Sequence, residues 1–416
     1  MPKFLPFALP VALFAALGMT PSVYASTGPS ADEVRAIVSE MLADADTRSS
    51  LQSSSGTAGH DGRFYLSSPG GDFRLNFGGY MQFRYMATFG DDLNGVADND
   101  DERGFKFQRT RLIFGGKLYD SIDFLLLPYA GPNGSWSILD AWAKTKLGDS
   151  GWTVQWGQFK LPFYREWLIS ERFNQMVERS DLNSVFSSSY AQGVQLSTTT
   201  DDYRVFVSYS DGLRTLNTDY NSTMEADYAI TARGEYKFSG NWGQFADMTS
   251  LGNQESGFMI GGAVHHQGRT TNFRGTDIDR LTQYTVDLNY EDTNWNATAA
   301  FIGRNIKQSV GGSVNDYGIL AQGGVFTSDK LELFGRYSLL MPDGDATGDD
   351  DFNTITAGFN YYLHGHAAKF TVDGVWFLDD PNMTTMIGFG SSTETGLLST
   401  TGDDQFSIRA QFQLIF

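Results

Sequence analysis

The sequence predicts an all-β fold, a 16-stranded antiparallel transmembrane β-barrel. Three observations lead to this prediction: apolar side chains recur at every second position over long stretches, short turns alternate with long loops, and the chain ends on an apolar row that closes with Phe416. The length of 416 residues suits one large barrel. Beyond the N-terminus, no stretch has the roughly 18 consecutive apolar residues of a spanning helix.

The composition narrows the possible function classes. The net charge of −19 argues against general nucleic-acid binding, which needs a basic surface. Cysteine is absent, so disulfides and thiolate metal sites are excluded. The 46 glycines and the aromatic content of 14% suit a barrel with aromatic girdles, although a large soluble β-sandwich shares this composition.

Residues 1–25 are predicted to be a signal peptide. Lys3 supplies the positive charge, residues 4–17 form the apolar core, and small residues lead to a cleavage site at Ala25. The prolines and the short core make an N-terminal anchor helix the weaker interpretation.

Residues 26–60 are predicted to form a short periplasmic helix and a linker. Apolar side chains between Val34 and Leu42 fall at steps of three and four residues, which indicates one apolar helix face. Residues 53–60 are rich in Ser and Gly and read as linker. A frayed tail is the alternative to the helix.

Residues 61–416 are predicted to form the barrel. Alternation persists from Phe73 to Phe89, much longer than the usual soluble strand of about five or six residues. An even strand number is typical of bacterial single-chain barrels. The sixteen predicted strands are 73–89, 104–118, 121–130, 136–147, 152–159, 190–199, 202–210, 228–238, 257–266, 280–291, 294–304, 314–326, 330–340, 351–363, 367–378 and 403–416.

The connectors support the same topology. Short turns such as 119–120 alternate with long loops such as 91–103, as in outer-membrane barrels. Two connectors depart from the rule: the loop after 121–130 is short, and the turn at 239–256 is long.

If apolar positions face lipid, the alternate positions face the lumen. This assignment of faces is constrained, because a charged side chain facing lipid costs roughly 2–4 kcal/mol at the midplane of the bilayer. Strand 104–118 changes phase between Phe107 and Arg109, and a bulge would resolve this. The lumen then receives twelve cations (Arg74, Arg84, Arg109, Arg111, Lys117, Lys144, Lys146, Arg233, Arg304, Arg336, Lys369 and Arg409) and six acids (Asp123, Asp140, Glu235, Asp287, Glu332 and Asp373).

Seven cations are the predicted pore-lining, solute-binding residues. Arg or Lys rings select anions by replacing their lost hydration with charge, and the guanidinium fork matches phosphate and carboxylate oxygens. The alternative is that wall cations neutralise Asp123, Asp140 and the glutamates of the insertion at 160–189, and so stiffen the wall. The seven residues are Arg84, Arg109, Arg111, Lys144, Lys146, Lys160 and Arg165; no catalytic residue, metal site or cofactor is predicted.

Residues 160–189 interrupt the strand pattern and are predicted to fold inward as a constriction loop. The segment mixes Arg and Glu with aromatic side chains, and long insertions of this kind are functional rather than disordered. Its acids and bases nearly balance, so we expect the segment to determine the size of the pore more than the charge of the solutes that the pore admits. An exposed loop over the extracellular mouth is the alternative.

Four segments make the chain resemble the phosphate-selective porin O and P family: 78–84 (GGYMQFR), 107–118 (FQRTRLIFGGKL), 139–144 (LDAWAK) and 157–163 (GQFKLPF). The resemblance implies a homotrimeric outer-membrane porin with an inward-folded third loop, an N-terminal periplasmic helix and an arginine-lined channel. The family's basic residues map onto Arg109, Arg111 and Lys160. Its central lysine cluster has no match in the insertion.

The sequence therefore favours a passive channel for small anionic solutes such as phosphate, in the bacterial outer membrane beside lipid and lipopolysaccharide. A general, non-selective or cation-tolerant porin is the alternative. A barrel hydrolase would need a Ser or Asp beside His265 or His266, and no partner is assignable, so no enzyme is expected. A soluble adhesin-like β-protein is the third possibility.

Two polar segments are candidate metal sites. His364 and His366 lie on one face if extended but have no evident third ligand, so we expect an ordinary turn. Residues 98–102 carry oxygen ligands that suit Ca²⁺, but a solvated acidic loop, or one bridged to lipopolysaccharide by divalent ions, is the favoured interpretation.

Overall fold

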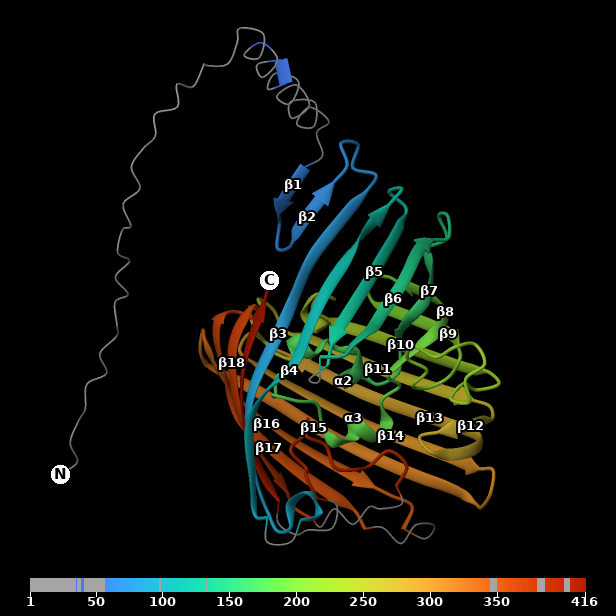
Figure 1. Cartoon of the computed structure of the whole chain (residues 1–416), viewed down its shortest axis with the longest axis vertical. Coiled ribbons are helices and arrows are strands. Elements are labelled where there is room, and N and C mark those ends of the chain that lie inside the picture. The colour runs from blue at the N-terminus through green and yellow to red at the C-terminus, as the bar shows by residue number, and fades with distance from the viewer. Residues whose placement is uncertain are drawn as a thin grey trace, which may run out of the picture. The chain divides into compact units, whose positions relative to one another are not determined.

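The computed structural model describes residues 35, 39–40, 57–96, 99–131, 134–344, 350–379, 386–399 and 405–416, and its large folded unit spans Gly56–Phe416. In this part of the chain, one antiparallel sheet of 19 strands closes on itself because the last strand pairs with β3 (Figure 1). Leaving out the β1–β2 hairpin and the short β12, sixteen strands form the closed ring. The predicted 16-stranded antiparallel barrel is confirmed.

Each ring strand overlaps one predicted strand. The ring consists of β3 (Arg74–Phe89), β4 (Asp101–Leu118), β5 (Ile122–Ala130), β6 (Trp136–Lys146), β7 (Trp152–Lys160), β8 (Tyr190–Thr199), β9 (Tyr203–Ser210), β10 (Ala229–Ser239), β11 (Gly257–Gln267), β13 (Thr276–Glu291), β14 (Trp295–Gln308), β15 (Ser313–Ser328), β16 (Leu331–Met341), β17 (Phe352–His364), β18 (Ala368–Phe377) and β19 (Phe406–Ile415).

The short elements lie outside these strands. They are β1 (Thr57–His60), β2 (Phe64–Ser67), β12 (Thr270–Phe273), α2 (Arg165–Leu168), α3 (Asp181–Phe186) and the 3₁₀ turns η1 (Leu93–Gly95), η2 (Glu171–Phe173) and η3 (Gln244–Ala246). The linker prediction for 53–60 is wrong at residues 57–60, because β1 pairs with β2, and β2 in turn pairs with the start of β3.

The side chains of the last strand alternate as the sequence predicts. Ile408, Phe412 and Leu414 are exposed on the outer face, whereas Arg409 and Gln411 are buried on the inner face. Burying only alternate positions is possible because successive side chains of a strand point to opposite faces of the sheet. The outer row is the surface that suits a hydrocarbon environment.

The predicted bulge in the second ring strand is confirmed. Gln82 pairs with Arg109, but the next residue, Phe83, pairs with Phe107, so Gln108 is the extra residue. Gln108 and Arg109 are therefore both buried although they are neighbours in the chain. The bulge keeps Phe107 on the outer face while Arg109 points inward.

One arc of the inner face is apolar, which the alternation rule does not predict. Ile302, Leu320, Leu340 and Phe352 are buried there, on β14 to β17, in one cluster with Phe186 of α3. Figure 1 shows α3 beside β15, and the two elements are in contact. Each such side chain contributes about 1.5–3 kcal/mol when fully buried, so α3 is fixed to this arc mainly by apolar packing.

Among the described residues, no helix combines the length and apolar character needed to cross a membrane. In the N-terminal unit, Arg35, Ser39 and Glu40 are helical. The signal peptide predicted for 1–25 and the rest of the predicted periplasmic helix lie outside the described residues.

The contact between α3 and the barrel wall predicts the effect of adding a side chain at Gly318. A Cβ atom at this position would lie 2.8 Å from Phe186 and 2.9 Å from Leu182, so Gly318→Val should displace α3 and destabilise the barrel by about 1–3 kcal/mol. Gly335→Val is the matched control, because its Cβ would meet nothing closer than an atom at 3.9 Å. Thermal unfolding of the detergent-solubilised protein measures both; equal midpoints for the two variants would contradict the packing.

Candidate functional site

Residues 161–189 connect β7 to β8 and contact strands on widely separated parts of the ring. The ring strands to which its side chains and backbone hydrogen-bond include β3, β4, β13, β16, β17, β18 and β19. The wall residues involved are Arg84 on β3, Arg111 on β4, Asn289 on β13, Arg336 on β16, Thr354 on β17, Asp373 on β18 and Gln413 on β19. The break from strand to irregular structure comes at Pro162, which cannot donate to a strand ladder.

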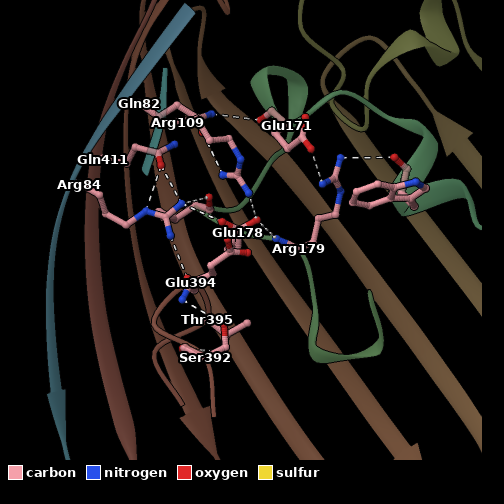
Figure 2. A network of polar contacts seen from close by, with 12 residues as sticks. Gln82, Arg84, Arg109, Glu171, Glu178, Arg179, Ser392, Glu394, Thr395 and Gln411 are labelled. Carbon is pink, nitrogen blue, oxygen red and sulfur yellow. Dashed lines mark hydrogen bonds and ion pairs between the residues drawn. The ribbon is translucent and has the colours of Figure 1, made fainter. Parts of the chain in front are cut away.

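Glu178 is the centre of the first ion-pair group. Its carboxylate accepts hydrogen bonds from Arg84 at 3.0 Å and Arg109 at 2.7 Å, and Figure 2 shows both guanidiniums pointing toward it. Burial alone would raise the pKa of Glu178, but the guanidiniums of Arg109 and Arg84 hold it well below its ordinary value. Arg84 also donates to the carbonyl of Glu394 at 2.8 Å, so the segment 386–399 contacts the same group.

Glu171 is the centre of the second group. It binds Arg111 at 2.7 Å and Arg179, from the same segment, at 2.8 Å. Burial opposes ionisation, yet Arg111 and Arg179 lower the pKa of Glu171 well below its ordinary value. The third buried glutamate of the segment, Glu166, binds Arg336 at 3.2 Å.

A cavity of about 460 Å³ lies between this segment and β4 to β10. Five cations line it, against three acids. The cations are Arg111, Lys160, Arg165, Arg172 and Arg204, and the acids are Asp140, Glu171 and Glu235. Glu235 lies 2.9 Å from Arg233 and 4.0 Å from Arg204, and Glu171 is paired as described above.

Three cavity cations have no ion pair with a carboxylate among the described residues: Lys160, Arg165 and Arg172. Lys160 donates to the Trp167 carbonyl at 2.7 Å and lies 4.5 Å from the Trp167 ring. Arg165 donates to Asn289 at 2.7 Å and to the Phe245 carbonyl at 2.8 Å. Arg172 lies 4.8 Å from the Phe173 ring. None of the three side chains is therefore neutralised by a carboxylate in direct contact.

The predicted site residues therefore divide into three sets. Arg84 and Arg109 are paired with Glu178, outside the cavity. Arg111, Lys160 and Arg165 line the cavity. Lys144 is half-buried over the Trp142 ring and Lys146 is exposed beside the turn after β6; neither lines this cavity. The binding of solute by any of the seven stays a prediction.

Sequence reasoning left Arg172 and Arg204 out of the site. The inward direction of Arg204 could have been predicted from the alternation along β9. Tyr203 and Val207 belong to the exposed outer row of this strand, and Arg204 lies at an alternate position. Arg172 lies in irregular structure, where no periodicity tells which way a side chain points.

No group of three His, Asp or Glu side chains within the described ranges has the arrangement of a metal site. His366, in the short turn between β17 and β18, instead contacts Asp247 at 3.1 Å.

The chain was compared with known proteins. The family model described as phosphate-selective porin O and P matches residues 80–376. No curated protein gives a significant match.

Several solved structures share the fold at low identity. The anion-selective porin from Comamonas acidovorans is 13% identical, with 82% of this chain and 99% of that chain covered and a TM-score of 0.56. The outer membrane channel DcaP of Acinetobacter baumannii is 14% identical, with 82% and 97% covered and a TM-score of 0.53. A trimer form of the outer membrane protein OmpT of Vibrio cholerae is 13% identical, with 82% and 98% covered and a TM-score of 0.52.

The Glu178 group predicts the effect of removing its one carboxylate. Glu178→Gln leaves Arg84 and Arg109 buried without a carboxylate, which should destabilise the protein by about 3–5 kcal/mol. Glu102→Gln is the control, because Glu102 is exposed. Urea-induced unfolding in detergent gives the free-energy change for each variant, and a loss no larger for Glu178→Gln than for Glu102→Gln would refute the assignment.

The lowered pKa values of Glu171 and Glu178 predict how stability depends on pH. A carboxyl group whose folded pKa is depressed contributes its full stability above its ordinary pKa of 4.5 and loses it as the pH falls toward the folded value. The contribution of these two carboxyl groups to the thermal transition should therefore change little between about pH 7 and pH 5 and fall below about pH 4.5. The Glu178→Gln variant should lose less thermal stability than the wild type when the pH falls below about 4.5. An equal loss in the two proteins would argue against a link between the Glu178 pKa and stability.

Proposed function

The chain belongs to the phosphate-selective porin O and P family, which makes it a bacterial outer-membrane porin, and we propose that it conducts small anionic solutes such as phosphate by passive diffusion. The observation that carries the anion preference is the cavity charge: five lining cations against three acids, with Lys160, Arg165 and Arg172 lacking a carboxylate partner in the described structure. A fixed excess of positive charge beside a narrow path favours anions over cations.

We further propose that residues 161–189 fold into the lumen and constrict it. The support is geometric: a segment that bonds to β3 and β4 and also to β13, β16 and β18 reaches far-apart strands of a closed ring. The shortest route between those strands crosses the interior.

The proposed path for solute runs past the cavity rather than past α3. The apolar cluster around Phe186, Leu320 and Phe352 is closely packed and leaves no comparable charged surface at its own position. The cavity side keeps charged and polar side chains at its surface, which suits a hydrated passage.

A general, cation-tolerant porin is the second candidate. Its support is that three of the seven predicted pore-lining cations, Arg84, Arg109 and Arg111, are each bound to a buried glutamate and so are not available to pair with a solute. Asp140 also lines the cavity and attracts cations.

We propose a homotrimer that contacts outer-membrane lipid and lipopolysaccharide, with a signal peptide at 1–25 and a periplasmic helix within 26–60. The family membership and the trimer form of a structure with the same fold support the oligomer. The exposed apolar row of β19 supports contact with hydrocarbon.

The reversal potential across a planar bilayer under a KCl gradient tests the anion preference. Wild-type protein should prefer chloride, and Lys160→Gln with Arg172→Gln should lower the chloride-to-potassium permeability ratio about two- to fivefold. Lys330→Gln, in the exposed turn before β16, is the matched control and should leave the ratio unchanged. Cation preference in the wild type would favour the second candidate.

A further inference from the structure

The cavity has a feature that a channel for inorganic ions does not need: inward-facing apolar side chains without a protein cover. Leu125 and Leu127 on β5 and Phe206 on β9 are half-buried and line the cavity. On the opposite arc, inward apolar side chains such as Ile302 and Phe352 are buried under α3. Apolar surface left in water is unfavourable, so the uncovered set suits a solute with an apolar body.

The uncovered side chains share the cavity with the three cations that lack a carboxylate partner in the described structure. Lys160 and Arg165 come from the end of β7 and the start of α2, and Arg172 follows from η2. The aromatic rings of Trp142 and Tyr190 also line this space. One wall region thus presents positive charge and aromatic surface together.

The size and charge of the cavity favour an organic anion over phosphate. Its volume of about 460 Å³ lies within the range of about 300–1,000 Å³ typical of small-molecule sites. A phosphate dianion would meet the carboxyl group of Asp140 and apolar surface that cannot replace its hydration. A monoanion needs only one of the cations, and its apolar body would cover the exposed side chains.

The long turn between β10 and β11 closes one side of this space. Phe245 and Ala246 of this turn line the cavity, and Arg165 donates to the Phe245 carbonyl at 2.8 Å. Met248 is buried further along the same turn. The length of this turn, unusual for its position, is thus explained by its role as part of the cavity wall.

We propose that this cavity is a binding site for organic monoanions that join a carboxylate to an aromatic body. The carboxylate pairs with the cations at Lys160, Arg165 and Arg172, and the ring lies against Phe206, Leu125 and Leu127. This inference rests on the proposed porin function and specifies the solute class that the path retains.

Block of chloride current through single channels of the full-length protein in a planar bilayer tests the proposal. Benzoate should halve the current at a concentration about tenfold lower than acetate, which has the carboxylate without the ring, and about tenfold lower than inorganic phosphate. Equal half-blocking concentrations for benzoate and acetate, or tighter block by phosphate, would overturn it.

A pair of variants tests where the aromatic body of the solute binds. Phe206→Ala should raise the half-blocking concentration of benzoate about tenfold, whereas Tyr209→Ala, an exposed aromatic on the outer face of the same strand, should leave it unchanged. An equal response of both variants would overturn the assignment of the site.

The two proposals fail in different ways. A wild-type channel that prefers cations in the reversal-potential measurement defeats the anion pore itself. A channel that prefers anions but does not distinguish benzoate from acetate defeats only the organic-anion site.

Discussion

Charge compensation inside a closed ring is the constraint on which the rest of this structure depends. Glu166, Glu171 and Glu178 are buried carboxylates on one segment, and an unpaired buried carboxylate is strongly unfavourable. The wall supplies Arg336, Arg111, Arg84 and Arg109 to meet them. Most inward arginines thus hold the segment 161–189 in place, and only cations outside these pairs are free to act on a solute.

The interior is divided into two unlike halves as a result. Apolar packing of α3 against β14 to β17 fills part of one half, whereas the half facing β5 to β9 keeps a cavity with cations, acids and uncovered apolar side chains. On the proposal that the segment 161–189 folds inward, it packs against one arc of the ring and supplies part of the charged lining of the cavity on the other.

The strands were predictable because their signal is local. Each strand shows apolar side chains at every second position, so the sequence predicts all sixteen ring strands. The change of phase between Phe107 and Arg109 also predicts the bulge, which the structure has at Gln108. The β1–β2 hairpin was missed because its strands are only four residues long and 53–60 has a linker-like composition.

The site was less predictable because its geometry is long-range. Inward positions could be predicted from the alternation of side chains along each strand. The pairing of Arg109 with Glu178, 69 positions later, could not be predicted from the local sequence of either residue. The inward apolar residues Ile302, Leu320, Leu340 and Phe352 break the alternation on four consecutive strands, and this is a sequence signal for where α3 packs.

The most direct test of the account uses the absence of natural cysteine. In a Leu182→Cys/Gly318→Cys variant, the close approach of the two positions should allow a disulfide that fixes α3 to β15. Single-channel conductance would be measured before and after oxidation. The account predicts that the cross-link forms and the conductance stays the same, since solute passes on the other side of the ring; failure to cross-link, or a channel closed by the cross-link, would contradict it.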